Sequence, residues 1–186
     1  MHSFKDSNAA SVLYAGDPIW ERLYRSAFPT YANSVYIEGE GWAQNGGVDR
    51  IITLTSGKTI SVEEKVRETD YGDILLEYWS SVDKGNRQNR RKGWIAKDMA
   101  CDYIAYLVKD TGTCYMLPFH ALRLAWKNNR QIWARKYKRV QADNGKYITV
   151  SVAVPIKVIL SAIMESMIIS DVSHLEPQET KIVAVS

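Results

Sequence analysis

The sequence has few of the residues that mark several common protein classes. Only two of its 186 residues are cysteines, Cys101 and Cys114, which is too few for the disulfide framework of a small secreted domain. The three histidines, His2, His120 and His174, are isolated and no Cys-x-x-Cys occurs, so a zinc site is not expected. We expect both cysteines to be buried thiols in a cytosolic protein.

Long hydrophobic runs are also absent. The most apolar region, residues 152–169, is interrupted by Pro155, Lys157 and Glu165, which argues against a transmembrane helix. The first ten residues, MHSFKDSNAA, are too polar for a signal peptide. The sequence therefore predicts a cytoplasmic protein without a membrane partner.

What the sequence does contain is an ordinary globular composition with an uneven charge distribution. It is 46% hydrophobic and 24% charged, and its length suits one domain. The net charge of +3 combines −6 over residues 1–83, +11 over residues 84–146 and −2 over residues 147–186. An acidic region beside a basic one is what a metal-dependent enzyme acting on a polyanion would need.

Residues 46–67, GGVDRIITLTSGKTISVEEKVR, predict a β-hairpin. Side chains alternate between faces along each strand, and a three-residue loop at 55–57 or 56–58 places the aliphatic side chains of both strands on one buried face. The opposite face then carries Asp49, Glu63 and Lys65.

The two loops give different neighbours across the hairpin. A loop at 55–57 sets Asp49 opposite Glu63. A loop at 56–58 sets Arg50 opposite Glu64, which is a favourable pair of charges. The sequence does not choose between these registers.

Two carboxylates and an ammonium on neighbouring strands suit a divalent cation. Carboxylate oxygens are the ligands that Mg²⁺ prefers, and a nearby lysine can orient water or balance charge on a phosphate. The alternative interpretation is a solvated sheet face on which Lys65 forms a surface ion pair with Asp49 and Glu63.

An aspartate on one strand followed by Glu-x-Lys on the next resembles the PD-(D/E)xK nuclease superfamily, with Asp49, Glu63 and Lys65 at the motif positions and Val48 where the family name has a proline. The resemblance implies an α/β fold with a restriction endonuclease-like mixed β-sheet flanked by helices. It also implies hydrolysis of phosphodiesters with Mg²⁺ or Mn²⁺, and a further metal ligand on the preceding helix, for which Glu21 is the candidate. The wider chain also resembles uncharacterised phage or prophage proteins, which implies a bacterial host cell.

Patterning predicts the remaining elements. We expect a partly ordered lead-in over residues 1–16, a single domain over 17–170 and a loose tail over 171–186. Within the domain, the expected helices are 18–28, 95–101, 118–128 and 155–169, the expected strands are 33–38, 73–81 and 147–154, and a second hairpin spans 103–117. A glycine-rich loop over 39–47 would approach Asp49, with Gln44 or Asn45 near a nucleotide.

Two basic segments predict the nucleic-acid contacts. Residues 84–92 and 123–139 contain no acidic side chain. They supply the expected phosphate-binding residues Lys84, Arg87, Arg90, Arg91, Lys92, Arg123, Lys127 and Arg130. Trp94 follows the first segment and could stack on a base, whereas Trp126 and Trp133 have the helical spacing of core residues.

Together these features predict a Mg²⁺-dependent nuclease acting on nucleic acid, with DNA as the expected substrate. The alternative is a non-catalytic nucleic-acid-binding or phage assembly protein with the same fold. A third option is binding of a host protein through exposed aromatic residues. Cleavage of both strands by a chain with one active site would favour a homodimer.

Overall fold

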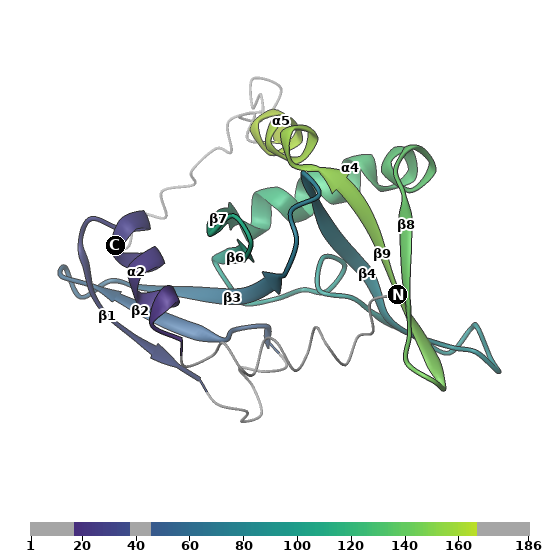
Figure 1. The fold of residues 1–186 in the computed structure, drawn as a ribbon, viewed down its shortest axis with the longest axis horizontal. Coiled ribbons are helices and arrows are strands. Elements are labelled where there is room, and N and C mark those ends of the chain that lie inside the picture. Colours follow the sequence, from purple (N-terminus) through teal and green to yellow (C-terminus); the bar gives the residue numbers. More distant parts are fainter. Residues whose placement is uncertain (1–16, 38–45, 167–186) are drawn as a thin grey trace, which may run out of the picture.

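The computed structural model describes residues 17–37 and 46–166, which form a mixed α/β protein (Figure 1). The described part contains the helices α2 (Pro18–Ala27), α4 (Phe119–Lys136) and α5 (Ile156–Ser166). A five-stranded mixed sheet has the order β1 (Tyr31–Tyr36), β2 (Arg50–Leu54), β3 (Thr59–Arg67), β6 (Tyr103–Val108) and β7 (Thr113–Pro118). A four-stranded antiparallel sheet has the order β5 (Arg90–Lys92), β4 (Asp73–Asp83), β9 (Tyr147–Pro155) and β8 (Arg139–Asp143). The predicted α/β class is confirmed.

The central hairpin forms with the loop at residues 55–57. Its ladder runs from Arg50 opposite Val62 to Thr53 opposite Thr59, and the Leu54 N–H donates to the Lys58 carbonyl at 2.9 Å. Gly57 adopts a positive φ of 81° in this loop, a conformation that glycine adopts readily because it lacks a Cβ. This register is the one that sets Asp49 opposite Glu63.

The first sheet is mixed because β6 pairs with β3 in parallel. A parallel neighbour requires the chain to cross over, and this crossover contains β4, β5 and the turns of residues 93–102. The helix expected over residues 95–101 is wrong. The N–H groups of Ala96 and Lys97 both donate to the Gly93 carbonyl, and the chain then leaves the turn without a further helical bond of this kind.

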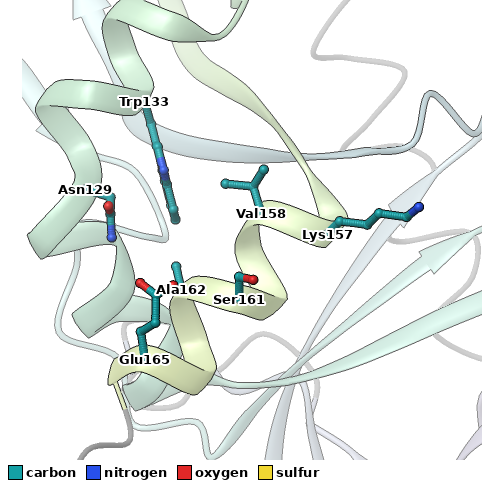
Figure 2. Close-up of a pocket in the computed structure, with 7 residues that line it drawn as sticks. All are labelled: Asn129, Trp133, Lys157, Val158, Ser161, Ala162 and Glu165. Carbon is teal, nitrogen blue, oxygen red and sulfur yellow. The ribbon is translucent and has the colours of Figure 1, made fainter.

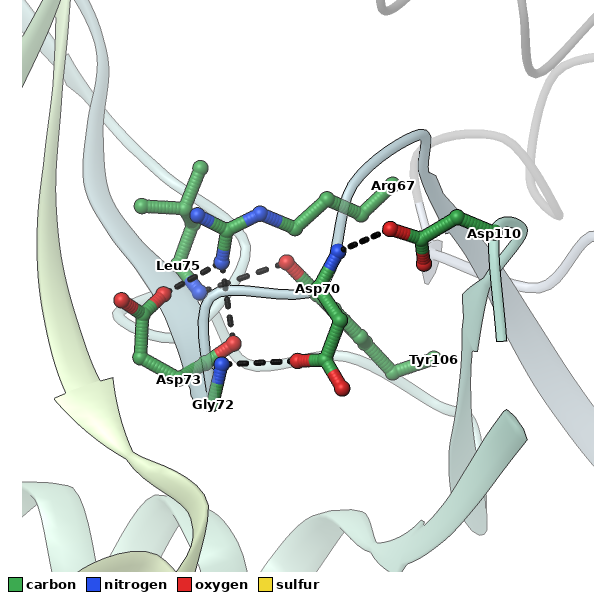
Figure 3. Close-up of polar contacts among 7 residues, drawn as sticks. All are labelled: Arg67, Asp70, Gly72, Asp73, Leu75, Tyr106 and Asp110. Atoms are coloured by element: carbon green, nitrogen blue, oxygen red, sulfur yellow. Dashed lines mark hydrogen bonds and ion pairs between the residues drawn. The ribbon is translucent and has the colours of Figure 1, made fainter. Parts of the chain in front are cut away.

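A polar network fixes the path from β3 to β4 (Figure 3). Arg67, the last residue of β3, donates to the carbonyl of Asp73 at 2.9 Å and also pairs with the Asp73 carboxylate. The Tyr106 hydroxyl accepts the Leu75 N–H at 3.3 Å, and Asp110 accepts the Asp70 N–H at 2.9 Å. These bonds connect the start of β4 to β6 and to the β6–β7 turn, so the second sheet is held against the first.

Two apolar clusters hold the layers together. In the smaller one, Trp20 and Tyr24 of α2 pack on the face of the first sheet that carries Ile52, Ile60 and Val62. The larger cluster joins the other face of this sheet to the second sheet, α4 and α5. Asp49, Glu63 and Lys65 therefore lie on the side of the hairpin that is turned away from α2.

Several details of the helices and strands differ from expectation. α2 begins as predicted, because Asp17 accepts the Ile19 N–H at 2.8 Å and Pro18 occupies the first turn. α4 continues eight residues beyond the predicted end at 128, and β5 and β8 were not predicted. The hairpin of β6 and β7 sets Cys114 opposite Leu107, and both cysteines are free thiols. Cys101 is buried as expected, whereas Cys114 is only half-buried.

Some expectations fall where the structure gives no description. These are the lead-in over 1–16, the glycine-rich loop with Gln44 and Asn45, the end of the last helix and the tail over 171–186. Within the described ranges, no helix is both long enough and apolar enough to cross a bilayer.

Candidate functional site

Asp49 and Glu63 lie side by side on neighbouring strands. Asp49 directly precedes β2, and its N–H donates to the carbonyl of Val62 at 2.9 Å. Its Oδ2 accepts the N–H of Glu64 at 2.7 Å. Because that N–H belongs to the peptide joining Glu63 to Glu64, the bond fixes the Asp49 carboxylate beside the Glu63 side chain.

Lys65 completes the predicted group from the same face of β3. Its Nζ donates to Oε1 of Glu63, and both side chains are largely buried, with exposed fractions of 27% for Lys65 and 11% for Glu63. Burial lowers the pKa of Lys65, but the negative charges of Glu63 and Asp49 outweigh it and leave this pKa raised. Lys65 is therefore a charged ammonium that contacts Glu63 and is attracted by the charge of Asp49.

The Asp49 carboxylate is in an unfavourable position for a negative charge. Burial and the charge of Glu63 raise the pKa of Asp49 from 3.8 to about 6, against the opposing effects of Lys65 and the Glu64 N–H. One ammonium thus only partly compensates two confined carboxylates. Additional positive charge at this point, such as a divalent cation, would stabilise the ionised pair.

Glu77 on β4 brings a third carboxylate close to Lys65. Burial raises the pKa of Glu77, and Lys65, Lys97 and a hydrogen bond from the Trp94 backbone act in the opposite direction. Sequence analysis did not select Glu77. Its signal was a single glutamate within the apolar run Leu75-Leu76-Glu77-Tyr78, because a buried carboxylate needs a polar or charged partner.

The segment after β5 packs tightly against Glu77. Gly93 lies so close that a Cβ there would overlap the Glu77 carbonyl and Cγ. The Ile95 N–H donates to the same carbonyl at 3.2 Å. Trp94, which sequence analysis considered for base stacking, is buried with 7% of its surface exposed. It supports Glu77 and is not available to a nucleobase.

Whether this site suits a metal depends on its donor set. In residues 17–37 and 46–166, no group of three or more His, Cys, Asp or Glu side chains is arranged to hold an ion. The two carboxylates that lie on neighbouring strands here are those of Asp49 and Glu63, whereas Glu77 approaches Lys65 from β4. Mg²⁺ commonly keeps several waters and is held by one or two carboxylates together with substrate phosphates. The carboxylates of Asp49 and Glu63 therefore fit Mg²⁺, which does not need a closed cage of protein ligands.

Glu21, the other metal ligand expected from sequence, lies elsewhere. It is on α2, where its carboxylate accepts from Arg25 at 2.6 Å, and both side chains are more than half exposed. α2 packs on the face of the sheet opposite to Asp49 and Glu63. The structure does not bring Glu21 to the other two carboxylates.

The middle residue of the Glu-x-Lys motif has a structural contact on that opposite face. Glu64 Oε1 accepts from Arg50 Nε at 2.6 Å and from the Tyr24 hydroxyl at 2.7 Å. All three residues are buried, with exposed fractions of 6%, 8% and 0% for Glu64, Arg50 and Tyr24. The Arg50–Glu64 pair predicted for the other register thus forms in this one, diagonally across the strands.

Four of the predicted nucleic-acid contacts converge on one pocket of about 240 Å³ between β4, β5 and α4. They are Lys92, Arg123, Lys127 and Arg130. Tyr78, Trp79 and Trp126 line the same pocket, together with Ile95 and Ala96. We call this the basic aromatic pocket.

The other predicted basic residues lie around it or farther away. Arg90 stacks over Trp79, with 4.2 Å between its Cζ and the ring centroid, and Arg91 is exposed in the same short strand. Arg87 is exposed in the preceding turn. Lys84 donates to Asp143 of β8 at 2.6 Å, so it has a structural partner away from the pocket.

A larger groove of about 400 Å³ lies between α4 and α5 (Figure 2). Trp133 and Asn129 face it from α4, and Glu165, Ser161 and Lys157 border it from α5. None of its lining residues belongs to the predicted site, and its one acidic and one basic side chain give it no strong charge.

Neither protein-family models, nor curated proteins, nor solved structures gave a match to this chain.

Proposed function

We propose that this protein is a Mg²⁺-dependent nuclease with a restriction endonuclease-like fold. The observation that carries the proposal is that Asp49, Glu63 and Lys65 meet on one face of the central hairpin, where their charges interact. The fold proposal is supported by the position of β3 at the centre of a mixed sheet whose other face is covered by α2. The crossover through β4 and β5, instead of a helix, departs from the simplest pattern of that superfamily.

In the proposed reaction, water attacks phosphorus and loses a proton to solvent, a new P–O bond forms, the bond to the leaving oxygen breaks, and that oxygen takes up a proton from solvent. Asp49 and Glu63 would hold Mg²⁺, which would supply charge stabilisation on the phosphate and make water more acidic. Lys65 would orient the attacking water and balance charge that develops on the phosphate. The negative charge of Glu77 on β4 also favours the protonated form of Lys65.

The surface charge supports a nucleic-acid substrate. Lys92, Arg123, Lys127 and Arg130 line one pocket together with Ile95 and Ala96, and the nearby Gly93 packs against Glu77. Basic side chains that bind phosphates supply much of the affinity of such proteins and make it dependent on salt. We further propose DNA as the substrate and a phage or prophage origin, with action in the bacterial cytoplasm and a homodimer if both strands are cut.

Cleavage of labelled linear, circular and branched DNA with Mg²⁺ or Mn²⁺ tests this function. Glu63→Gln and Lys65→Ala should each reduce cleavage by orders of magnitude, because the first removes a proposed ligand of Mg²⁺ and the second removes the ammonium that would orient the attacking water. Glu68→Gln and Lys58→Ala are matched controls that remove the same kinds of charge from exposed positions. Undiminished cleavage by Lys65→Ala would refute the assigned roles.

The second candidate function is nucleic-acid binding without catalysis. It is favoured by the direct contact of Lys65 with Glu63 and by the lack of a third carboxylate ligand among the described residues. This alternative predicts salt-sensitive DNA binding that does not respond to Mg²⁺ or to Asp49→Ala. If no cleavage is found and wild type and variant bind DNA equally, this candidate replaces the first.

A further inference from the structure

The basic aromatic pocket combines two kinds of side chain that the proposed phosphodiester chemistry does not by itself require. Its positive charge comes from one residue of β5 and three of α4, Lys92, Arg123, Lys127 and Arg130. Arg123 is paired with Asp98, and no acidic residue lines the pocket itself. The charge suits a phosphate, and phosphates are present in every form of nucleic acid.

The aromatic side chains narrow the choice of ligand. Tyr78 and Trp126 lie with their ring centroids 5.8 Å apart, and Tyr78 and Trp79 with theirs 5.9 Å apart. Tyr78 and Trp79 are only half-buried, and the stacked Arg90 restrains the Trp79 ring. Ring faces beside basic groups are the feature that lets proteins stack unpaired bases.

The size of the pocket also points to a single base. Its volume of about 240 Å³ is below the roughly 300–1,000 Å³ that pockets for drug-sized ligands occupy. Bases inside a duplex are paired and stacked, so their faces cannot reach a concave aromatic wall unless they leave the helix. A duplex could bind the outer basic residues but could not fill the pocket.

The pocket is also close to the candidate active site along the chain. Tyr78 and Trp79 directly follow Glu77 on β4. Ile95 and Ala96 line the pocket, whereas Gly93 and the backbone of Trp94 pack against Glu77. The segments that line the pocket therefore also hold Glu77, the carboxylate close to Lys65.

We propose that the basic aromatic pocket binds one unpaired nucleotide, stacked on Tyr78 and Trp79 with its phosphates on Lys127 and Arg130. The link to cleavage rests on the proposed nuclease function. The substrate class is then single-stranded nucleic acid, or a duplex with a single-stranded branch or end.

Binding in EDTA, where no cleavage occurs, tests the proposal. Fluorescence anisotropy would compare a labelled oligothymidine with a duplex of equal length, for wild type, Trp79→Leu and Trp79→Phe. We expect wild type to bind the single strand more tightly. Trp79→Leu should lose roughly tenfold in affinity for it with little change for the duplex, because stacking on an aromatic ring is lost. Trp79→Phe keeps a ring and should retain most of the affinity.

Two control variants separate base stacking on Trp79 and phosphate binding by Lys127 and Arg130 from the loss of any exposed aromatic or basic side chain. Tyr71→Ala removes an exposed aromatic residue that also lies against an arginine, before the start of β4, and should leave binding unchanged. Lys127→Gln with Arg130→Gln should weaken single-strand and duplex binding alike and reduce the dependence on salt, and Lys58→Gln should do neither.

Equal wild-type affinity for single strand and duplex would overturn the proposal, as would an equal loss in Trp79→Leu and Trp79→Phe. These results are distinguishable from failure of the nuclease proposal. Cleavage that depends on Glu63 without single-strand preference would retain the nuclease and reject the pocket. Single-strand preference that depends on Trp79, without any cleavage, would retain the pocket and reject the nuclease.

Discussion

Replacing Asp49 with asparagine should stabilise the metal-free protein at alkaline pH while it abolishes cleavage. Burial and the charge of Glu63 raise the pKa of Asp49 from 3.8 to about 6. A carboxyl group with a higher pKa in the folded state binds its proton more tightly there. Its stabilising contribution is therefore complete below pH 3.8 and is lost as the pH rises through about 6.

The size of the effect follows from this shift. Each pKa unit corresponds to about 1.36 kcal/mol, so ionised Asp49 lowers the free energy of unfolding by at most roughly 3 kcal/mol. Asp49 is partly exposed and water screens part of this effect, so we expect about 2 kcal/mol. The asparagine carries no charge, and its side-chain oxygen can still accept the Glu64 N–H.

Urea unfolding in EDTA at alkaline and acidic pH measures the difference. Above the pKa of Asp49, Asp49→Asn should be more stable than wild type by about 2 kcal/mol. Well below that pKa the two proteins should be nearly equal, because a protonated aspartate resembles asparagine. Glu68→Gln, which removes an exposed carboxylate paired with Lys109, is the control and should change little at either pH. A gain that is absent at alkaline pH, or equal at both pH values, would refute the reasoning.

Two further predictions concern packing around the site, and urea unfolding measures both. Gly93→Ala should lower the free energy of unfolding by about 1–3 kcal/mol, because the new Cβ overlaps the Glu77 carbonyl. Gly85→Ala is the control, because a Cβ there meets only the flexible Asp83 side chain. If both substitutions lower the stability equally, the tight contact between Gly93 and Glu77 is rejected. Arg50→Ala should lower the free energy of unfolding by about 3–5 kcal/mol, since the buried Glu64 loses its ionic partner. Joint replacement of Arg50 by Met and Glu64 by Leu should recover much of this loss, and a double variant as unstable as Arg50→Ala would contradict the assignment.

The central hairpin was largely predictable because its signals are local. Alternation of polar and apolar residues set the two faces, and Gly57 marked the turn. Register was not predictable, since loops at 55–57 and 56–58 bury the same aliphatic residues. The structure also shows why the Arg50–Glu64 contact did not distinguish them: long side chains reach diagonal neighbours across two strands.

Features that depend on contacts between distant segments were not predictable. The pattern of residues 73–81 correctly predicted a strand, although only Ile74 and Leu76 within that range are fully buried. It did not predict that β4 pairs with β9 and brings Glu77 close to Lys65. The two basic segments were evident in the sequence. Their convergence requires β5 to fold back on β4 and α4 to pack beside it, and no local pattern encodes that arrangement.

The central claim is that Asp49 and Glu63 hold a divalent cation beside Lys65. Mn²⁺ binding measured by electron paramagnetic resonance, with and without DNA, tests it most directly, because metal binding can be detected before the preferred substrate is known. The account predicts a single saturable Mn²⁺ site that is lost in Glu63→Gln and retained in Glu21→Gln. Saturable binding that persists in Glu63→Gln, or that disappears in Glu21→Gln, would contradict it.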